Sequence, residues 1–436
     1  SYAYKGIFGK YEGKFSLAPY STIVKEYGDL EHRDIWEFPL NLSDQEIYFL
    51  LLHLWELDKG KFKYYFLDEN CSFQLLSLIE AVRPYLNLTE QFSMWTIPGD
   101  TIKALADNTD LLGPPVYRPS LGTLLTERVK TLSTEEIYLI QEIINNTKSL
   151  SDIQLFNRDP QSAARILEIA ADYLLFYQYD TKEQTKSSPL FMSLLRARSR
   201  LPIKTQRQVI KQISSPKQFT HSGRLSLGVG REKEKMFWQI DLRPAYYDRF
   251  DPPAGHRQGA YFSILETSIK IFPNDNILAL NQITLLKIYS LPPYDPLLQT
   301  MSWKFKSSIY NNAFLRPGLS AALEGGIGLT KQLRKRSIFN IGITIITHLQ
   351  DSPQKNNFLF LGPEFSIFHN FSKTTTAGCT ISTTSPVNEM ENYHIKSLLH
   401  YTLQLSSDFS FSLIHEHERD STQFKNQFRL MGQFYF

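Results

Sequence analysis

The C-terminal stretch of the chain reads Gln423-Phe424-Lys425-Asn426-Gln427-Phe428-Arg429-Leu430-Met431-Gly432-Gln433-Phe434-Tyr435-Phe436. Apolar side chains at Phe424, Phe428, Leu430, Phe434 and Phe436 share one parity, whereas Gln423, Lys425, Gln427, Arg429 and Gln433 occupy the other. Successive side chains of a strand point to opposite faces, so this stretch predicts a strand with one apolar and one polar face.

The same alternation recurs upstream. Trp238, Ile240 and Leu242 alternate with Gln239, Asp241 and Arg243, and Met301, Trp303 and Phe305 alternate with Ser302, Lys304 and Lys306. Segmentation gives about twelve such runs between residues 218 and 436. Ten is the alternative count, because alternation is weak at 277–291 and at 373–384.

Two architectures fit alternating strands: a soluble β-sandwich and an antiparallel transmembrane β-barrel. Three features favour the barrel. Charged residues lie at strand centres on the polar face, as expected for a polar lumen, and aromatic residues gather near strand ends. The terminal residue Phe436 also resembles the signature by which bacterial outer-membrane proteins are recognised for insertion.

Composition agrees with this interpretation. The 436 residues carry a net charge of +3 without a long basic tract, which argues against nucleic acid as a partner. The sequence contains no run of about 18 apolar residues, so it predicts no transmembrane helix. Aromatic residues make up 13% of a chain whose mean hydropathy is only −0.28, as in barrels that expose only alternate residues to lipid.

The chain divides into three predicted parts: residues 1–130 with mixed strands and helices, a helical connector at 131–215, and the barrel at 216–436. An even strand number places both barrel ends, and hence residues 1–215, in the periplasm of a Gram-negative bacterium. The N-terminus lacks the features of a signal peptide, so we expect a processed form or a fragment.

Helix starts are readable in the first two parts. Ser43 with Glu46 and Ser133 with Glu136 are capping boxes. Asn70 is the expected N-cap of a helix that stops at Pro84, and Asp100 is the expected cap of a third helix.

The chemically most suggestive segment is Asp68-Glu69-Asn70-Cys71. It places a thiol in the first turn of a helix, where the helix dipole favours the thiolate that a nucleophile needs. A free cysteine is also often a small buried apolar residue, which is the non-catalytic alternative.

Four segments add a family resemblance: Tyr4 to Gly9, Leu30 to Glu37, Leu42 to Glu46, and Asp68 to Cys71. Together they resemble the periplasmic domain of the Lnb-like family, bacterial lipoprotein intramolecular transacylases with a permuted papain-like α+β fold. The resemblance covers about residues 1–130 and implies that Cys71 is the nucleophile.

In that family the partner histidine lies in a His-x-x-Leu-Arg-like motif upstream of the segment that begins this chain. We therefore expect the N-terminal part of the domain to be missing. The candidate catalytic residues here are Cys71, Asn70 and His32; His53 is more typical of a structural helix residue. No cofactor and no metal are expected, because His415 and His417 alone are a weak metal motif.

These observations predict a periplasmic cysteine acyltransferase-like enzyme or thiol hydrolase, anchored in the outer membrane. Its expected partners are outer-membrane lipids and a lipoprotein or phospholipid substrate. Two alternatives stay open: a papain-like peptidase or amidase of the envelope, and a non-enzymatic barrel or scaffold with a degenerate cysteine domain.

Overall fold

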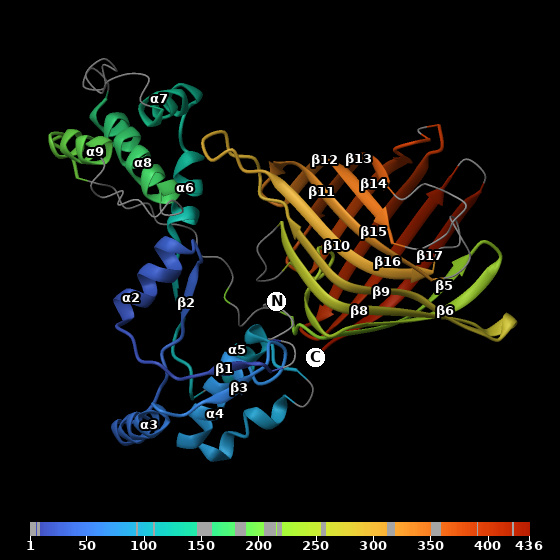
Figure 1. Cartoon of the computed structure of the whole chain (residues 1–436), viewed down its shortest axis with the longest axis horizontal. Helices are drawn as coiled ribbons and strands as arrows, with labels where there is room; N and C mark the ends of the chain where they lie inside the picture. Colours follow the sequence, from blue (N-terminus) through green and yellow to red (C-terminus); the bar gives the residue numbers. More distant parts are fainter. Residues whose placement is uncertain are drawn as a thin grey trace.

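The computed structural model describes residues 6, 9–92, 95–107, 110–145, 159–178, 189–204, 215, 220–253, 259–311, 319–349, 359–389, 391–420 and 423–436. The chain start, including Tyr4 of the family-like segments, lies outside the described residues. A β-barrel fills one half of the molecule, and the N-terminal and helical regions lie against one of its ends (Figure 1).

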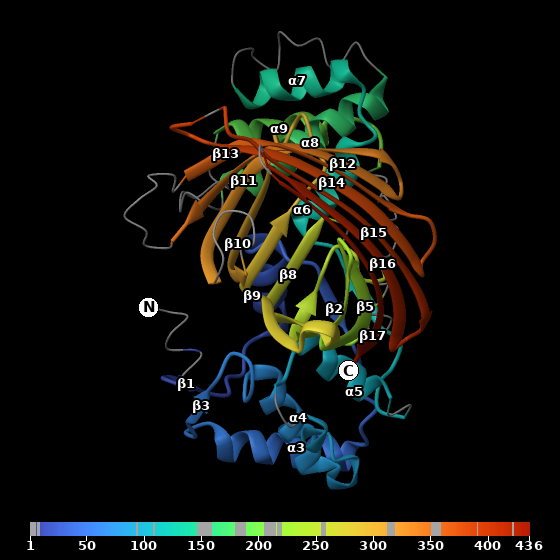
Figure 2. The ribbon, with the colours of Figure 1, turned by 90° about the vertical axis from the view of Figure 1, so that its right-hand side faces the viewer.

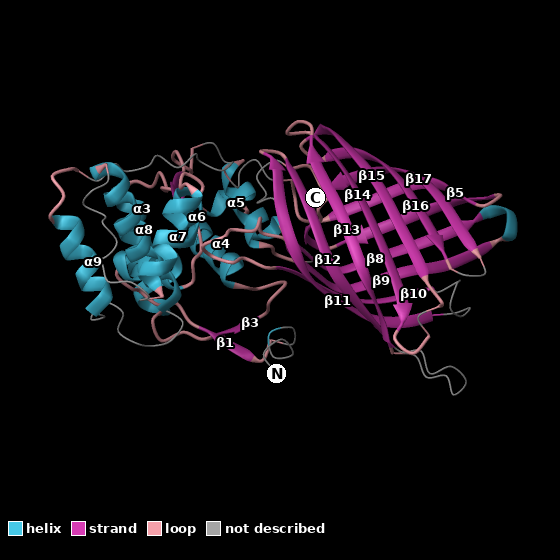
Figure 3. Ribbon diagram, turned by 90° about the horizontal axis from the view of Figure 1, so that it is seen from above, coloured by secondary structure: helices cyan, strands magenta, loops and turns pink. Residues whose placement is uncertain are grey.

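The barrel is closed by twelve antiparallel strands. These are β5 (Arg224–Glu232), β6 (Lys235–Arg243), β8 (Ala260–Phe272), β9 (Ile277–Ser290), β10 (Ser302–Asn311), β11 (Leu319–Arg334), β12 (Ser337–His348), β13 (Leu359–Asn370), β14 (Thr375–Pro386), β15 (His394–Ser406), β16 (Phe409–Arg419) and β17 (Phe424–Tyr435). Each pairs with its neighbour, and β17 pairs with β5 to complete the ring. Figure 3 shows the tilted strands from above. The barrel prediction is confirmed, as are the weakly alternating runs that became β9 and β14.

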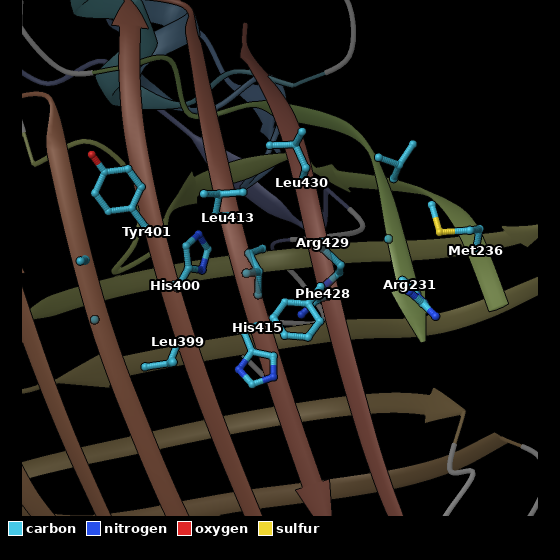
Figure 4. A pocket seen from close by; sticks show the side chains of 15 residues that line it. Arg231, Met236, Leu399, His400, Tyr401, Leu413, His415, Phe428, Arg429 and Leu430 are labelled. Atoms are coloured by element: carbon cyan, nitrogen blue, oxygen red, sulfur yellow. The ribbon is translucent and has the colours of Figure 1, made fainter. Parts of the chain in front are cut away.

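Side-chain parity also agrees with the sequence. Phe428 is 59% exposed on the outer face, whereas its neighbour Gln427 is 2% exposed in the lumen. A groove of about 600 Å³ lies on the barrel wall. Figure 4 shows the side chains that line it, among them Leu399, Leu413 and Leu430 of neighbouring strands. All three are exposed, so the groove belongs to the apolar outer surface of the barrel.

One predicted strand is interrupted. The alternating run that contains Trp238, Ile240 and Leu242, predicted as one strand over 236–248, is split into β6 and the short β7 (Ala245–Tyr247), with Pro244 between them. Proline has no N–H for the sheet ladder, so it ends the strand. β7 pairs with β8, and Tyr246 takes a left-handed backbone conformation with φ of 70°.

The barrel end at which β5 begins and β17 ends is here named the proximal rim. Two long connections lie at this rim, 244–259 and 291–301, while the other turns there are short, at 335–336, 371–374 and 407–408. The N-terminal and helical regions face the proximal rim (Figure 1).

The helical region consists of α6 (Leu121–Val129), α7 (Thr134–Ile144), α8 (Pro160–Gln178) and α9 (Pro189–Ser199). The capping box of Ser133 and Glu136 is present at the start of α7. Leu297 and Leu298 of the 291–301 connection are buried in the same apolar core as these helices. The Tyr177 hydroxyl also donates a 2.6 Å hydrogen bond to the Leu298 carbonyl, so the barrel and the helical region share one core.

The N-terminal region pairs β1 (Tyr11–Gly13) with β3 (Phe62–Tyr64), and β2 (Ile35–Glu37) with β4 (Val116–Arg118). Its helical segments are α2 (Tyr20–Val24), η1 (Lys25–Leu30), α3 (Asp44–Leu57), α4 (Cys71–Val82), η2 (Pro84–Leu86), η3 (Thr89–Gln91) and α5 (Pro98–Ala106). Figure 2 shows α3, α4 and α5 together at the end of the molecule away from α7. Ser43 and Glu46 form the predicted capping box of α3.

The expectation that Asp100 caps the third helix is wrong. α5 begins at Pro98 with Ile97 in the cap position, so Asp100 lies inside the first turn. Its carboxylate accepts hydrogen bonds from the backbone N–H (3.0 Å) and the hydroxyl of Ser222, at the proximal rim. The Asp100 carboxylate, which the sequence pattern assigns to the N–H groups at the helix start, therefore binds Ser222, a residue far away in sequence.

None of the described helices is long and apolar enough to cross a membrane.

Candidate functional site

Cys71 is the first residue of α4 and is exposed. Its position is fixed by the preceding residue. Asn70 takes an extended conformation with φ of −87° and ψ of −172°, and its side-chain oxygen accepts from the backbone N–H of Ser72 (3.0 Å) and of Phe73 (3.2 Å). Two of the N–H groups that a helix start leaves unpaired are thus satisfied, and the thiol projects from a well-defined first turn.

The amide nitrogen of Asn70 connects this turn to the rest of the domain. It donates to the Thr96 carbonyl at 2.6 Å and to the Phe66 carbonyl at 3.3 Å. The side chain is 2% exposed, and both amide hydrogens are engaged in these bonds. Asn70 therefore acts as the predicted N-cap and holds the starts of α4 and α5 together.

The start of α4 lies near the proximal rim of the barrel. The Cys71 side chain lies within electrostatic range of the Tyr246 phenol of β7. Nearby, Trp95 meets the terminal Phe436 with ring centroids 6.1 Å apart, and the Asp100 carboxylate binds Ser222. The segments that carry Cys71 and α5 are thus fixed against the point where β17 closes on β5.

His32 has a different environment. Its imidazole lies 4.2 Å, centroid to centroid, from the Phe176 ring of α8, and Gly122 of α6 approaches its Cβ. The structure thus brings Asn70 and Cys71 together at one helix start and places His32 against the helical region.

A second histidine lies at the rim and was not singled out from the sequence. His221 Nδ1 is 3.6 Å from the Asp100 carboxylate. It lies three residues before β5 begins at Arg224, next to the Ser222 that binds Asp100. His221 is thus held at the proximal rim, although 150 residues separate it from Cys71 in sequence. No local sequence signal could have joined them.

A cavity of about 240 Å³ lies between α3 and α4. It is lined by Phe15, His53, Leu57, Gly60, Lys61, Phe62, Gln74, Ser77 and Leu78. Cys71, Gln74 and Leu78 recur at helical spacing, so the cavity follows the face of α4 on which Cys71 lies. Its lining is mainly apolar, with His53 and Lys61 as the cationic or titratable groups.

In the described part of the chain, no three His, Cys, Asp or Glu side chains are grouped as possible metal ligands. The His415 ring stacks on Phe428 at 4.2 Å, and His417 Nδ1 lies 2.5 Å from the Asn426 side-chain oxygen.

Three family models match consecutive parts of the chain. Residues 1–108 match the Lnb N-terminal periplasmic domain, 115–210 match a domain of unknown function (DUF7842), and 214–435 match a domain of unknown function (DUF7840). The chain belongs to the DUF7840 family. The resemblance of the first part to Lnb-like domains is confirmed. The predicted domain boundaries at about residues 130 and 215 stay a prediction.

Solved structures match the barrel at low identity. A KdgM porin in complex with disordered oligogalacturonate is 9% identical, with 49% of this chain and 99% of that chain covered and a TM-score of 0.30. A NanC porin is 10% identical, with coverages of 49% and 100% and a TM-score of 0.33. An outer membrane channel from Pseudomonas putida F1 is 6% identical, with coverages of 54% and 100% and a TM-score of 0.32. No curated protein matches the chain.

The DUF7840 protein is therefore an outer-membrane β-barrel with an Lnb-type periplasmic domain. The proximal rim is its periplasmic end, because the Lnb-type domain lies against it. The first barrel strand, β5, also begins at this rim, and the last, β17, ends there. The outer face presents exposed apolar residues such as Trp238, Leu413 and Phe428 to the lipid.

Proposed function

We propose that this protein is an outer-membrane-anchored cysteine acyltransferase or thiol hydrolase that acts on acyl esters of lipoproteins or phospholipids. The observation that carries the proposal is the exposed Cys71 at a capped helix start, held next to the periplasmic rim of the barrel. Cys71 is the nucleophile, and Asn70 fixes the turn that presents it.

The location favours a membrane-bound substrate. The ester bonds of a lipid lie at the boundary between headgroups and hydrocarbon, which is the level of a barrel rim. Contacts of Trp95 with Phe436 and of Asp100 with Ser222 fix the start of α4 at this rim. A thiol there meets inner-leaflet esters without lifting the lipid out of the membrane.

The chemistry is acyl transfer in two steps. The Cys71 thiolate attacks the ester carbonyl carbon, a C–S bond forms, the ester C–O bond breaks, and the alcohol leaves with a proton. An amine or water then attacks the thioester carbonyl, the C–S bond breaks, and an amide or carboxylic acid is released with the regenerated thiol. An imidazole is the usual group that takes and returns these protons.

Two histidines are candidates for that imidazole. His221 has its Nδ1 3.6 Å from the Asp100 carboxylate, an arrangement that orients the imidazole ring. His32, the candidate from sequence, instead contacts Phe176. We assign proton transfer to His221, and a substitution of His32 serves as the comparison when this assignment is tested.

The cavity between α3 and α4 supplies a place for an acyl chain. Its apolar lining includes Phe15, Leu57 and Phe62, and it lies along the same face of α4 as Cys71. α3 presents further exposed apolar side chains, with Trp55 83% and Leu51 53% exposed. This surface suits a hydrocarbon substrate better than a polar muropeptide.

The test uses the purified full chain in liposomes with a lipopeptide that carries an alkyne-labelled ester-linked acyl chain. We expect label to appear on the protein, to be removed by neutral hydroxylamine as a thioester is, and to be lost in Cys71→Ser. The matched control is Cys379→Ser, since Cys379 is the second free cysteine and lies in β14 of the barrel wall.

The alternatives give other results in the same assay. An envelope peptidase or amidase would cleave muropeptides in a Cys71-dependent way and leave the lipopeptide unchanged. A scaffold would turn over neither substrate, and the equal reactivity of Cys71→Ser and the parent chain would contradict the proposed enzyme.

A further inference from the structure

The connection after β7 enters the barrel lumen at the periplasmic end. Phe250 is 6% exposed, and its ring stacks on His400 of β15 with centroids 4.0 Å apart and meets Phe368 of β13 at 5.6 Å. A Cβ added to Gly378 of β14 would lie 2.8 Å from a Phe250 ring carbon, so this close approach requires glycine.

These partners lie on the opposite wall. In one direction around the barrel, the strands after β6 are β5, β17, β16, β15 and then β14. In the other direction, the strands after β8 are β9 to β13 and then β14. Phe250 leaves the wall at β7, beside β6 and β8, and reaches β13 and β15. The segment 248–251 therefore crosses the lumen from one wall to the other.

Ion pairs fix both flanks of Phe250. The Asp251 carboxylate binds Arg224 Nη1 at 2.8 Å and also Arg243, and the three side chains are 1%, 8% and 0% exposed. On the other flank Asp248 pairs with Lys287, which also contacts Glu266 at 2.9 Å. Asp251, Arg224 and Arg243 are thus buried charges inside the lumen, and each depends on its partner.

Aromatic and aliphatic side chains pack around Arg249 and Phe250. Arg249 lies 5.0 Å from the centroids of the Tyr289 and Phe368 rings. Phe250 is part of a buried cluster with Tyr261, Tyr289, Leu291, Ile338 and Phe368. An apolar core inside the barrel is the opposite of the polar, hydrated interior of an open pore.

We propose that residues 248–251 close the barrel at its periplasmic end, and that the barrel is a non-conducting anchor rather than a channel. The Asp251 bridge to Arg224 and Arg243 holds the closure. On the other side of this closure the lumen keeps a cavity of about 410 Å³, lined by charged side chains such as Glu324, Lys396 and Glu416. This inference does not depend on the activity of Cys71.

The test is the ionic conductance of the purified full chain in planar lipid bilayers. The parent protein is expected to give no steady open-pore current. Phe250→Ala combined with Asp251→Ala removes the crossing ring and the carboxylate that Arg224 and Arg243 share, so conducting steps should appear. Glu418→Gln is the matched control: it breaks the 2.6 Å pair with Lys396 on the wall without touching residues 248–251, and it should stay closed.

Steady porin-like steps from the parent protein would overturn the proposal, whatever the variants do. A double variant that stays closed while it migrates as a folded, heat-modifiable barrel would also overturn it. If the double variant does not fold, Phe250→Ala alone is read by the same criterion.

Discussion

The side-chain amide of Asn70 donates a 2.6 Å hydrogen bond to the backbone carbonyl of Thr96. This bond joins the start of α4 to the segment that leads into α5, and α5 in turn carries Asp100 to the barrel rim. The residue before the candidate nucleophile thus links helix capping with the docking of the domain on the barrel.

Asn70→Ala removes both functions of this side chain. Loss of an N-cap alone costs about 0.5–2 kcal/mol, and the buried Thr96 carbonyl also loses its donor. We expect a lower unfolding temperature of the periplasmic region by calorimetry in detergent. Asn70→Ser keeps a cap acceptor and should fall between the parent and the alanine variant; equal stability of alanine and parent would show that the cap is dispensable.

The assignment of proton transfer separates His221 from His32. His221→Gln removes the imidazole beside Asp100 of α5. Under the proposed assignment, alkylation of Cys71 by iodoacetamide should then require higher pH for the same rate. His32→Gln should leave that pH profile unchanged and reduce stability through its lost contact with Phe176. The reverse pattern would return the catalytic role to His32.

Glu136 gives the helical region a defined response to acid. Burial alone raises the pKa of its carboxyl, but hydrogen bonds from the Ser162 hydroxyl, Arg165 and the Ser133 backbone N–H outweigh burial and lower the pKa to about 2. Because this value lies below 4.5, the group stabilises the folded state at higher pH, and that contribution is lost as the pH falls from about 4.5 to about 2.

The full linkage contribution is about 3 kcal/mol, since each tenfold change in proton affinity corresponds to about 1.4 kcal/mol. Glu136→Gln should lower the unfolding temperature at pH 7 and flatten its fall below pH 4.5, measured by calorimetry. Glu135→Gln, at the exposed neighbouring position, is the control and should keep the acid response of the parent.

The barrel was predictable because its signal is local. Trp238 and Gln239, or Phe428 and Gln427, differ in environment as neighbours in sequence, and strand geometry alone assigns them to opposite faces. The capping boxes at Ser43 and Ser133 are equally local, since donor and acceptor lie three residues apart.

The surroundings of Cys71 were not predictable, because they depend on contacts between residues that lie far apart in sequence. Alternation continues through Pro244 into Tyr246, so the sequence reads as one strand where the chain in fact turns inward. Asp100 satisfies the local rule for a helix cap, but Ser222 binds its carboxylate. Asp251 depends on Arg224 and Arg243 from two strands, and no spacing in the sequence encodes that pairing.

The orientation of the barrel wall is tested by two adjacent residues of β17. Phe428 is 59% exposed toward lipid, whereas Gln427 lies in the lumen, where its side chain donates to Glu232 at 3.2 Å. An arginine facing lipid costs roughly 2–4 kcal/mol at the bilayer midplane and less toward the interface. Phe428→Arg should therefore impair folding into membranes, with a reduced fraction of heat-modifiable barrel on gels.

Gln427→Arg is the matched control, because it changes the same strand by one position and introduces the same charge. Its guanidinium remains in the polar lumen next to the Glu232 carboxylate, which already accepts from Gln427 and contacts Lys425 at 3.6 Å. The variant should fold as the parent does. If the Gln427 variant failed while the Phe428 variant folded, the apolar face would have to point inward, and the strands would form the core of a soluble sandwich instead of a lipid-facing wall.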